Sequence, residues 1–217
     1  MRAIYQVTAH NAIYTLRIEL EHITPLVWRR IAIPGSATFW DLHVAIQDAM
    51  GWNDSHLHQF EIPRSRGEPP TLIGIPSRDD DADFRPLPGW ELRIADHISR
   101  QSPEIHYAYD FGDDWEHRIV FEEAAAAEAG SRYPKCLAGE RSSPPDDSGG
   151  PHSYADFLEM IADKTHPEHA STHRWARSIK RLRRRFDPEH FDEREVRFSD
   201  PQPRLQELLN AIAQGKV

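Results

Sequence analysis

The chain has 217 residues, 39% of them hydrophobic, and a net charge of −9, which suits one large domain or two small ones. Six Trp, six Tyr and nine Phe argue against a disordered chain, and the negative charge argues against a general affinity for nucleic acid. The sequence has a single cysteine, no apolar leader and no apolar run near the roughly 20 residues of a membrane span, so we expect a soluble cytoplasmic protein.

The N-terminal part predicts two strands followed by a helix. Residues 13–22 alternate between apolar and polar side chains, and residues 27–33 repeat that period of two. Residues 38–51 change to a helical period, with Thr38 as the N-cap and Gly51 as the C-terminal stop.

The middle of the chain predicts further strands. Residues 56–62 return to a period of two, and the Pro-rich, charged residues 63–90 suggest an excursion with one short strand at 71–75. We expect a short helix over residues 93–101. Two alternating runs, 104–111 and 115–123, flank Gly112 and predict a hairpin.

The C-terminal third is predicted to be a loop and then helices. The loop covers residues 136–151, and the helices cover 153–163, 167–184 and 203–215. The fold class is therefore α+β: a mainly antiparallel sheet of hairpins packed with several helices, in one domain that ends in a C-terminal helix. We place an N-terminal extension at 1–12, the α+β domain at 13–198 and the terminal amphipathic helix at 199–217.

Six motifs in this order resemble the plasmid pRiA4b ORF-3-like family. They are "PLVWRRIAIPGSATFWDLHVAIQDAMGW", "HLHQFEI", "YDFGDDWEH", "YPKCLAGERSSPPDDSGG", "YADFL" and "FDPEHFD", and they lie within residues 13–198. The resemblance implies a bacterial or archaeal protein, in some cases a passenger of plasmids and other mobile elements, and it implies no particular reaction or cofactor.

This chain departs from the family pattern at two places. Ser148 stands where the family commonly has a cysteine, so a thiolate metal site shared with Cys136 would be broken here, because a hydroxyl is a poor ligand for soft metals. The basic run "ARSIKRLRRR" is inserted between Trp175 and Phe186, where the family tends to pass directly from a Trp into its "FDP" motif.

The stretch "YDFGDDWEH", residues 109–117, has two interpretations. A kinase-type D-F-G is excluded, since the chain has neither a Gly-rich loop nor an H-R-D catalytic loop. The stretch is either a tight turn in which Asp113 and Asp114 cap backbone amides, or part of a divalent-metal site. The candidate metal ligands are His56, His58, Asp110, Asp113, Asp114, His117, Asp146 and Asp147.

Two of these ligands, His56 and His58, are expected on one face of a strand, where side chains two residues apart are neighbours. They either pack at a sheet edge or contribute to the metal site. Asp146 and Asp147 lie in an acidic loop that ends at Gly149-Gly150 before a helix, and a cation or an arginine suits that loop better than a phosphate. Four further residues are candidates for a pocket: Trp28, Arg30, His43 and Trp115.

A second candidate site is the basic stretch, residues 174–185. It comprises Arg174, Arg177, Lys180, Arg181, Arg183, Arg184 and Arg185 on a predicted helix. Such a run indicates an anion-binding patch that could contact nucleic acid, although the acidic residues after it could neutralise it within the fold.

Two main functional hypotheses follow, and the sequence leaves both open. The first is a non-catalytic binding or accessory module, associated by resemblance with mobile elements, that contacts nucleic acid or a protein partner. The second is a hydrolase-like enzyme that depends on a divalent metal held by the His and Asp residues above. A third, a resolvase-like recombinase, would need a serine nucleophile with surrounding arginines, and the sequence does not identify one. No catalytic residue is assigned, because no nucleophile motif or phosphate-binding loop is present.

Overall fold

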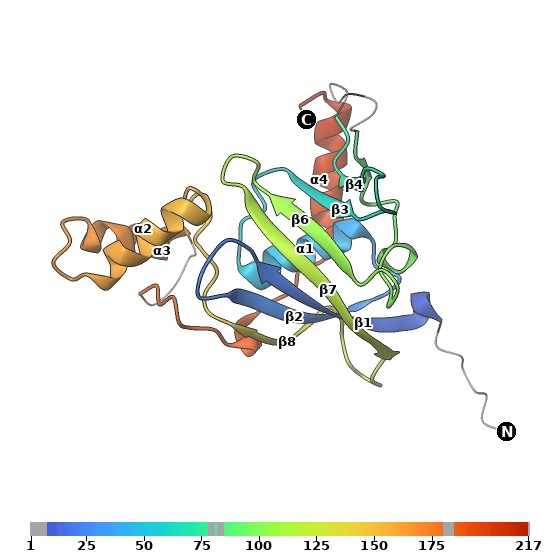
Figure 1. The fold of residues 1–217 in the computed structure, drawn as a ribbon, viewed down its shortest axis with the longest axis horizontal. Coiled ribbons are helices and arrows are strands. Elements are labelled where there is room, and N and C mark those ends of the chain that lie inside the picture. The colour runs from blue at the N-terminus through green and yellow to red at the C-terminus, as the bar shows by residue number, and fades with distance from the viewer. Residues whose placement is uncertain (1–7, 78–80, 82–84, 180–184, 217) are drawn as a thin grey trace.

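A computed structural model describes residues 8–77, 81, 85–179 and 185–216 of the chain. Within these residues the fold is one eight-stranded sheet in the order β5-β4-β3-β6-β7-β1-β2-β8, with four α-helices (Figure 1). Only β4 and β5 pair in parallel; the other neighbours are antiparallel. The predicted α+β class, with a mainly antiparallel sheet and a C-terminal helix, is confirmed.

The strands and helices have the following bounds. The strands are β1 (Ala12–Leu20), β2 (Val27–Pro34), β3 (His58–Ile62), β4 (Thr71–Gly74), β5 (Leu87–Pro88), β6 (Glu104–Tyr109), β7 (Trp115–Ala126) and β8 (Lys135–Glu140). The helices are α1 (Phe39–Met50), α2 (Gly150–Ala162), α3 (His169–Ile179) and α4 (Pro201–Ala213), and short 3₁₀ turns cover Ala9–Asn11, Ile94–Asp96 and Glu193–Glu195.

Helix α1 begins and ends as its sequence predicts. The Thr38 side chain accepts from the Asp41 amide at 3.1 Å, and the Asp41 carboxylate accepts from the Thr38 amide at 2.8 Å, which makes a capping box. Gly51 follows the helix with a φ of 69°, a conformation that costs glycine little. These local signals do not depend on the rest of the fold.

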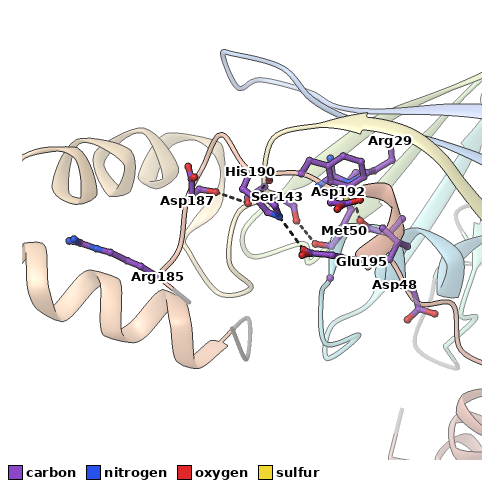
Figure 2. A pocket seen from close by; sticks show the side chains of 14 residues that line it. Arg29, Asp48, Met50, Ser143, Arg185, Asp187, His190, Asp192 and Glu195 are labelled. Atoms are coloured by element: carbon purple, nitrogen blue, oxygen red, sulfur yellow. Dashed lines mark hydrogen bonds and ion pairs between the residues drawn. The ribbon is translucent and has the colours of Figure 1, made fainter. Parts of the chain in front are cut away.

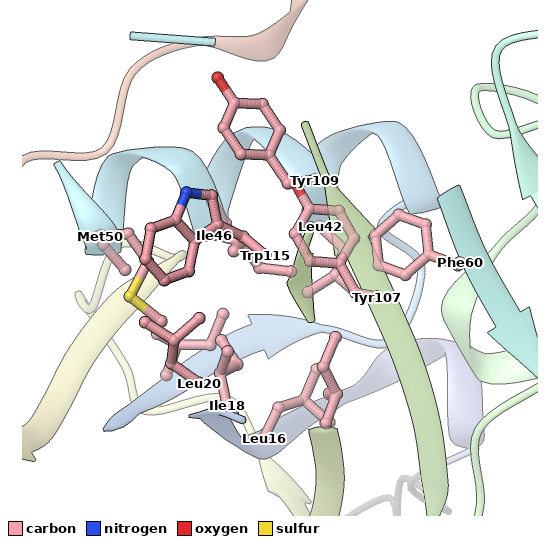
Figure 3. Close-up of a cluster of buried hydrophobic side chains, with 14 of the residues drawn as sticks. Leu16, Ile18, Leu20, Leu42, Ile46, Met50, Phe60, Tyr107, Tyr109 and Trp115 are labelled. Atoms are coloured by element: carbon pink, nitrogen blue, oxygen red, sulfur yellow. The ribbon is translucent and has the colours of Figure 1, made fainter. Parts of the chain in front are cut away.

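Helix α1 packs across one face of the sheet, and the core lies between them (Figure 3). Leu16, Ile18 and Leu20 of β1 face Leu42 and Ile46 of the helix, and all five are fully buried. Tyr107, Tyr109 and Trp115 of the β6–β7 hairpin fill the same layer and are at most 1% exposed, whereas Phe111 in the turn is 55% exposed. Strand alternation therefore sends the apolar face of β1 and of the hairpin to one side.

The opposite face of the sheet carries paired charges. Arg118 binds Glu19 at 2.6 Å and Glu104 at 2.8 Å, and Arg17 also binds Glu19 at 2.5 Å. Each such pair is partly exposed and contributes little stability by itself. The net effect is a face whose cations are largely neutralised by neighbouring carboxylates.

Two secondary-structure predictions are wrong. The predicted loop 136–151 begins as strand β8, which pairs with the edge of β2. The pattern of β8 is weak because Gly139 stands where Phe191 packs: a Cβ atom there would lie 2.6 Å from the Phe191 ring. The predicted helix 93–101 is only the 3₁₀ turn Ile94–Asp96, which is too short for helical periodicity to reveal.

Helices α2 and α3 lie side by side and project from one end of the sheet (Figure 1). We call residues 150–179 the helical arm. The rings of Phe157 of α2 and Trp175 of α3 meet edge-to-face with a centroid distance of 6.0 Å. Phe186, only 2% exposed, also packs on the Phe157 ring, at a centroid distance of 5.4 Å. Helix α3 covers part of the predicted helix 167–184; residues 180–184 lie outside the described part of the chain.

Candidate functional site

Three of the sequence-predicted metal ligands meet at one end of the sheet. Nε2 of His56 lies 2.8 Å from Oδ1 of Asp147 and 3.4 Å from Oδ2 of Asp110. One donor atom from each of the three residues lies within 4.8 Å of the other two. Because they come from the segment before β3, the β6–β7 turn and the loop before α2, the tertiary fold assembles this His56–Asp110–Asp147 cluster.

Asp110 is positioned by the turn that follows β6. Its Oδ1 accepts from the amides of Gly112 at 3.0 Å and Asp113 at 3.3 Å, while its Oδ2 faces His56. The left-handed positions of the turn are Asp110 and Asp114, each with a φ of 57°. In the tight-turn interpretation Asp113 and Asp114 cap backbone amides. Asp113 does so, at Gly149, whereas the amides of the turn itself are capped by Asp110, because an aspartate tolerates this conformation and bonds the amide two residues on.

The acidic loop before α2 is held to the rest of the protein by its other aspartate. Oδ2 of Asp146 accepts from the Asn53 amide at 2.5 Å, and Asp146 is only 2% exposed. From the turn, Oδ2 of Asp113 accepts from the Gly149 amide at 2.9 Å. Asp113 and Asp146 thus pin the loop on both sides of Asp147, whose exposed carboxylate points to His56.

The remaining predicted ligands lie outside the cluster. His58 begins β3, is 3% exposed, and stacks on the ring of His43 at a centroid distance of 3.5 Å. His117 is fully buried, with Nδ1 3.2 Å from the Tyr107 carbonyl. Asp114 is exposed on the turn and contributes its amide to the Asp110 carbonyl. We expected His56 and His58 on one face of a strand, but His56 precedes β3, so the two do not share a strand face.

The cluster has the donor chemistry of a site for a borderline or hard divalent cation. Two carboxylates supply two negative charges, and an imidazole nitrogen favours metals such as Mn²⁺ or Zn²⁺ over Ca²⁺. Ligands about 2.1 Å from one ion lie at most about 4.2 Å apart. The 4.8 Å limit of the cluster therefore needs only a small inward movement, which the 57%-exposed side chain of Asp147 permits.

The described residues offer Cys136 no partner for a thiolate metal site. Cys136 is buried on β8, where its thiol lies 3.6 Å from the Ala138 carbonyl, and burial raises the pKa of this thiol. The Ser148 hydroxyl is buried and has no hydrogen-bond partner within the described residues. Neither residue joins the cluster at His56.

The four residues proposed for a further pocket lie on opposite faces of the sheet. Trp28 and Arg30 are on the charged face, where the Arg17 guanidinium stacks on the Trp28 ring at 4.1 Å and Arg30 binds Glu122 at 2.6 Å. His43 and Trp115 are buried on the core side. The structure does not bring these four together, because the alternation along β2 sends its odd-numbered residues inward.

A buried polar network around His43 was not predicted as a unit. Nδ1 of His43 lies 2.9 Å from the Tyr107 hydroxyl, and Nε2 of His43 lies 2.7 Å from the Asp54 carboxylate. Asp54 also binds Arg204 at 3.2 Å. Burial raises the pKa of Tyr107, and bonds from His43 and Arg204 outweigh burial to lower the pKa of Asp54. Since Arg204 belongs to α4, this network fastens the C-terminal helix to α1. The adjacent His58, whose pKa burial lowers well below its usual value, completes this buried layer.

The basic stretch is described only at its two ends. Arg174 and Arg177 lie exposed on α3, and Arg185 follows the helical arm. The other four cations, Lys180, Arg181, Arg183 and Arg184, fall outside the described residues. Figure 2 shows Arg185 reaching between the two helices of the arm, where its Nη2 contacts Nε2 of His169.

A cleft of about 210 Å³ opens between the C-terminal end of α1 and residues 185–196 (Figure 2). At its floor Arg29 is 2% exposed and stacks under the Phe191 ring at 4.0 Å. The Arg29 guanidinium donates to the carbonyls of Ala49, Trp28 and Glu140 at 2.8–3.0 Å, and burial lowers its pKa to about 10. We interpret Arg29 as a C-terminal cap of α1, since a cation there complements the helix dipole.

Comparison with known proteins identifies the family. The family model described as "Plasmid pRiA4b ORF-3-like protein" matches residues 12–195. The chain belongs to this family. It is 34% identical over 168 residues to the uncharacterized protein y4hQ of Sinorhizobium fredii, covering 77% of this chain and 82% of y4hQ. It is also similar to the crystal structure of a protein of unknown function, MM3350 from Methanosarcina mazei Go1, with 36% identity and a TM-score of 0.75 over 86% of this chain and 98% of that one.

The family match agrees with the motif resemblance, and these relatives carry no assigned reaction. Among the described residues, none of the helices has the length and apolar character that crossing a bilayer requires.

Proposed function

We propose that this member of the pRiA4b ORF-3-like family is a non-catalytic module that binds nucleic acid through its helical arm and the basic stretch. The observation that carries the proposal is the separation of charge. Residues 164–185 contain eight Lys or Arg and one acidic residue, Glu168, in a chain whose net charge is −9. A basic segment of this kind supplies the phosphate contacts on which affinity depends.

The placement of the arm supports this function. Arg174 and Arg177 are exposed on α3, which projects from one end of the sheet, so a nucleic acid can approach them from beyond the sheet. The cations of the sheet are engaged by carboxylates, as with Arg118 and Glu19. The basic stretch, residues 174–185, is therefore the segment where contacts to phosphates would release counterions.

The test is a binding titration over a range of salt concentrations. Fluorescence anisotropy with a labelled oligothymidylate should give a log affinity that falls linearly with log salt. The double variant Arg174→Glu, Arg177→Glu should bind at least tenfold more weakly, with a salt slope reduced by about 1.4, because each contact to a single strand contributes about 0.7. The control is Arg66→Glu, the same change at an exposed position outside the arm.

Two results would count against this function. Affinity that does not depend on salt would exclude phosphate contacts, and equal losses in the arm variant and the Arg66→Glu control would exclude a role for the arm. If oligonucleotides fail to bind at all, the arm would instead be a surface for an acidic protein.

A second candidate function is divalent-cation binding at the His56–Asp110–Asp147 cluster. Its specific support is that donor atoms from three distant segments already lie within 4.8 Å of one another. An ion there would neutralise two carboxylates and tie the loop of Asp147 to the sheet. In a metal-dependent hydrolase, the same ion would supply Lewis acidity or an activated water.

Calorimetry with Mn²⁺ and Zn²⁺ tests the cation site on protein purified without an affinity metal. We expect one bound ion per chain, and Asp147→Asn or His56→Gln should reduce the affinity by more than tenfold. The matched control is Asp114→Asn, which removes an exposed carboxylate from the same turn but not from the cluster. Equal binding by all variants would rule out the cluster. Metal-dependent cleavage of a phosphodiester or ester that Asp147→Asn abolishes would favour an enzyme over a binding module.

A further inference from the structure

The helical arm contains a cleft separate from the metal cluster. The cleft, of about 630 Å³, lies between α2, α3 and the chain that follows Arg185. This volume is within the range of about 300–1,000 Å³ that is usual for small-molecule sites. Its apolar walls include Leu158, Ile161 and Phe186, and its polar lining includes His173, Lys164 and Arg185.

Two histidines of α3 line the cleft in defined tautomers. Nδ1 of His169 lies 3.0 Å from the Met160 carbonyl, and Nε2 of His173 lies 3.2 Å from the Ile161 carbonyl. Since a carbonyl only accepts, these nitrogens donate, and both rings cap the last turn of α2. These contacts give both histidines a structural role.

The tautomers leave specific hydrogen-bonding needs. The remaining nitrogen of His169 accepts from Arg185, which orients the guanidinium between the helices. The remaining nitrogen of His173, Nδ1, is a buried acceptor with no partner among the described residues. Burial also lowers the pKa of His173, so the ring is neutral at pH 7 and Nδ1 needs a donor.

The charges at the cleft are not symmetrical. Arg141 binds Glu189, so these two lining charges neutralise each other. The Asp187 carboxylate also lines the cleft and accepts from the Glu189 amide at 3.0 Å, which leaves one negative charge against the two cations Lys164 and Arg185. Lys164 and Arg185 then face the cleft as cations beside an apolar wall, a combination that suits a ligand with an anionic group and a flat apolar body.

We propose that this cleft takes one unstacked nucleotide of a single strand, with the base between α2 and α3 and its phosphate against Lys164 and Arg185. This inference rests on the proposed nucleic-acid function and adds a preference for single strands over duplexes. A nucleobase offers flat faces to the apolar wall and an N–H donor on its edge, whereas the phosphodiester group of the strand offers only acceptors. A base inside a duplex cannot enter the cleft without being flipped out.

The experiment fills the cleft and leaves the cations in place. Ala162→Trp puts an indole into the cleft from the end of α2, and Ala155→Trp makes the same change at an exposed position of α2 outside it. Anisotropy titrations use a labelled oligothymidylate and a labelled duplex of equal length. We expect Ala162→Trp to weaken single-strand binding about tenfold or more and to leave duplex binding unchanged, while Ala155→Trp changes neither.

A competition with unmodified protein keeps the inference testable if Ala162→Trp does not fold. Thymidine 5′-monophosphate should displace the single strand at concentrations where inorganic phosphate does not. If Ala162→Trp folds and binds single strands normally, or if phosphate competes equally well, the inference is wrong while the proposed function stands. If unmodified protein binds neither oligonucleotide, both are wrong.

Discussion

Protonation of the buried His117 should destabilise the fold in acid by an amount that the structure allows us to estimate. The ring is fully buried between β6 and the Trp52 side chain, and its Nε2 has no partner among the described residues. Burial lowers its pKa from 6.5 to about 4, against the opposing effect of bonds to the Tyr107 and Trp115 carbonyls. The imidazolium is therefore favoured in the unfolded chain.

The sign and size follow from this difference in pKa. The stability that neutral His117 contributes is complete above pH 6.5 and is lost as the pH falls towards 4. Each unit of difference between the unfolded and folded pKa is worth about 1.4 kcal/mol, so the full loss is about 3 kcal/mol. About 2 kcal/mol of this loss falls between pH 7 and pH 5. His58, buried beside His43, adds to the acid sensitivity in the same direction.

Urea unfolding from pH 7.5 to pH 4 measures the effect. In His117→Phe, the free energy of unfolding should fall by about 2 kcal/mol less than in unmodified protein between pH 7 and pH 5. The exposed His152 provides the control, because His152→Gln should reproduce the unmodified pH dependence. Parallel curves for His117→Phe and unmodified protein would refute this account, even if the variant is less stable at every pH.

Three substitutions test how the site and the helices are held. Gly150 has a φ of 78° and a Cβ there would lie 2.1 Å from the Asp113 carbonyl oxygen, so Gly150→Ala should cost at least about 2 kcal/mol by urea unfolding. Leu42→Ala should cost about 3–4 kcal/mol by the same measurement, because the side chain is fully buried under the sheet. Arg204→Met should cost only about 1 kcal/mol but should speed proteolysis of α4, since it releases the helix from Asp54.

The elements with strong local signals were predictable from the sequence. Helix α1 has its capping box at Thr38 and its glycine stop at Gly51, and both operate within a few residues. Strand β8 was missed because its place is set by pairing with β2, roughly a hundred residues earlier, and by the packing of Phe191 on Gly139. Edge pairing of that kind leaves little trace in a hydrophobic pattern.

The candidate metal ligands could be proposed from the chemistry of their side chains. Which of them meet in space could not be predicted from the sequence. His56, Asp110 and Asp147 stood among eight candidates because carboxylates and imidazoles bind divalent metals. Strand β3 begins at His58, so His58 is buried in the sheet while His56 lies outside the strand. The Asp146 carboxylate already accepts a hydrogen bond from the Asn53 amide. The histidines of α3 were likewise visible in the sequence, whereas their role in capping α2 depends on how the two helices pack.

The sequence by itself determined the α+β class, the family, the apolar faces of the main strands and the basic character of residues 174–185, because periodicity and composition act over a few residues. Only the tertiary structure decided which polar groups meet. His56 and Asp147 are 91 residues apart in the chain and 2.8 Å apart in space. Contacts over such separations form only when the sheet and its loops have been fixed by packing.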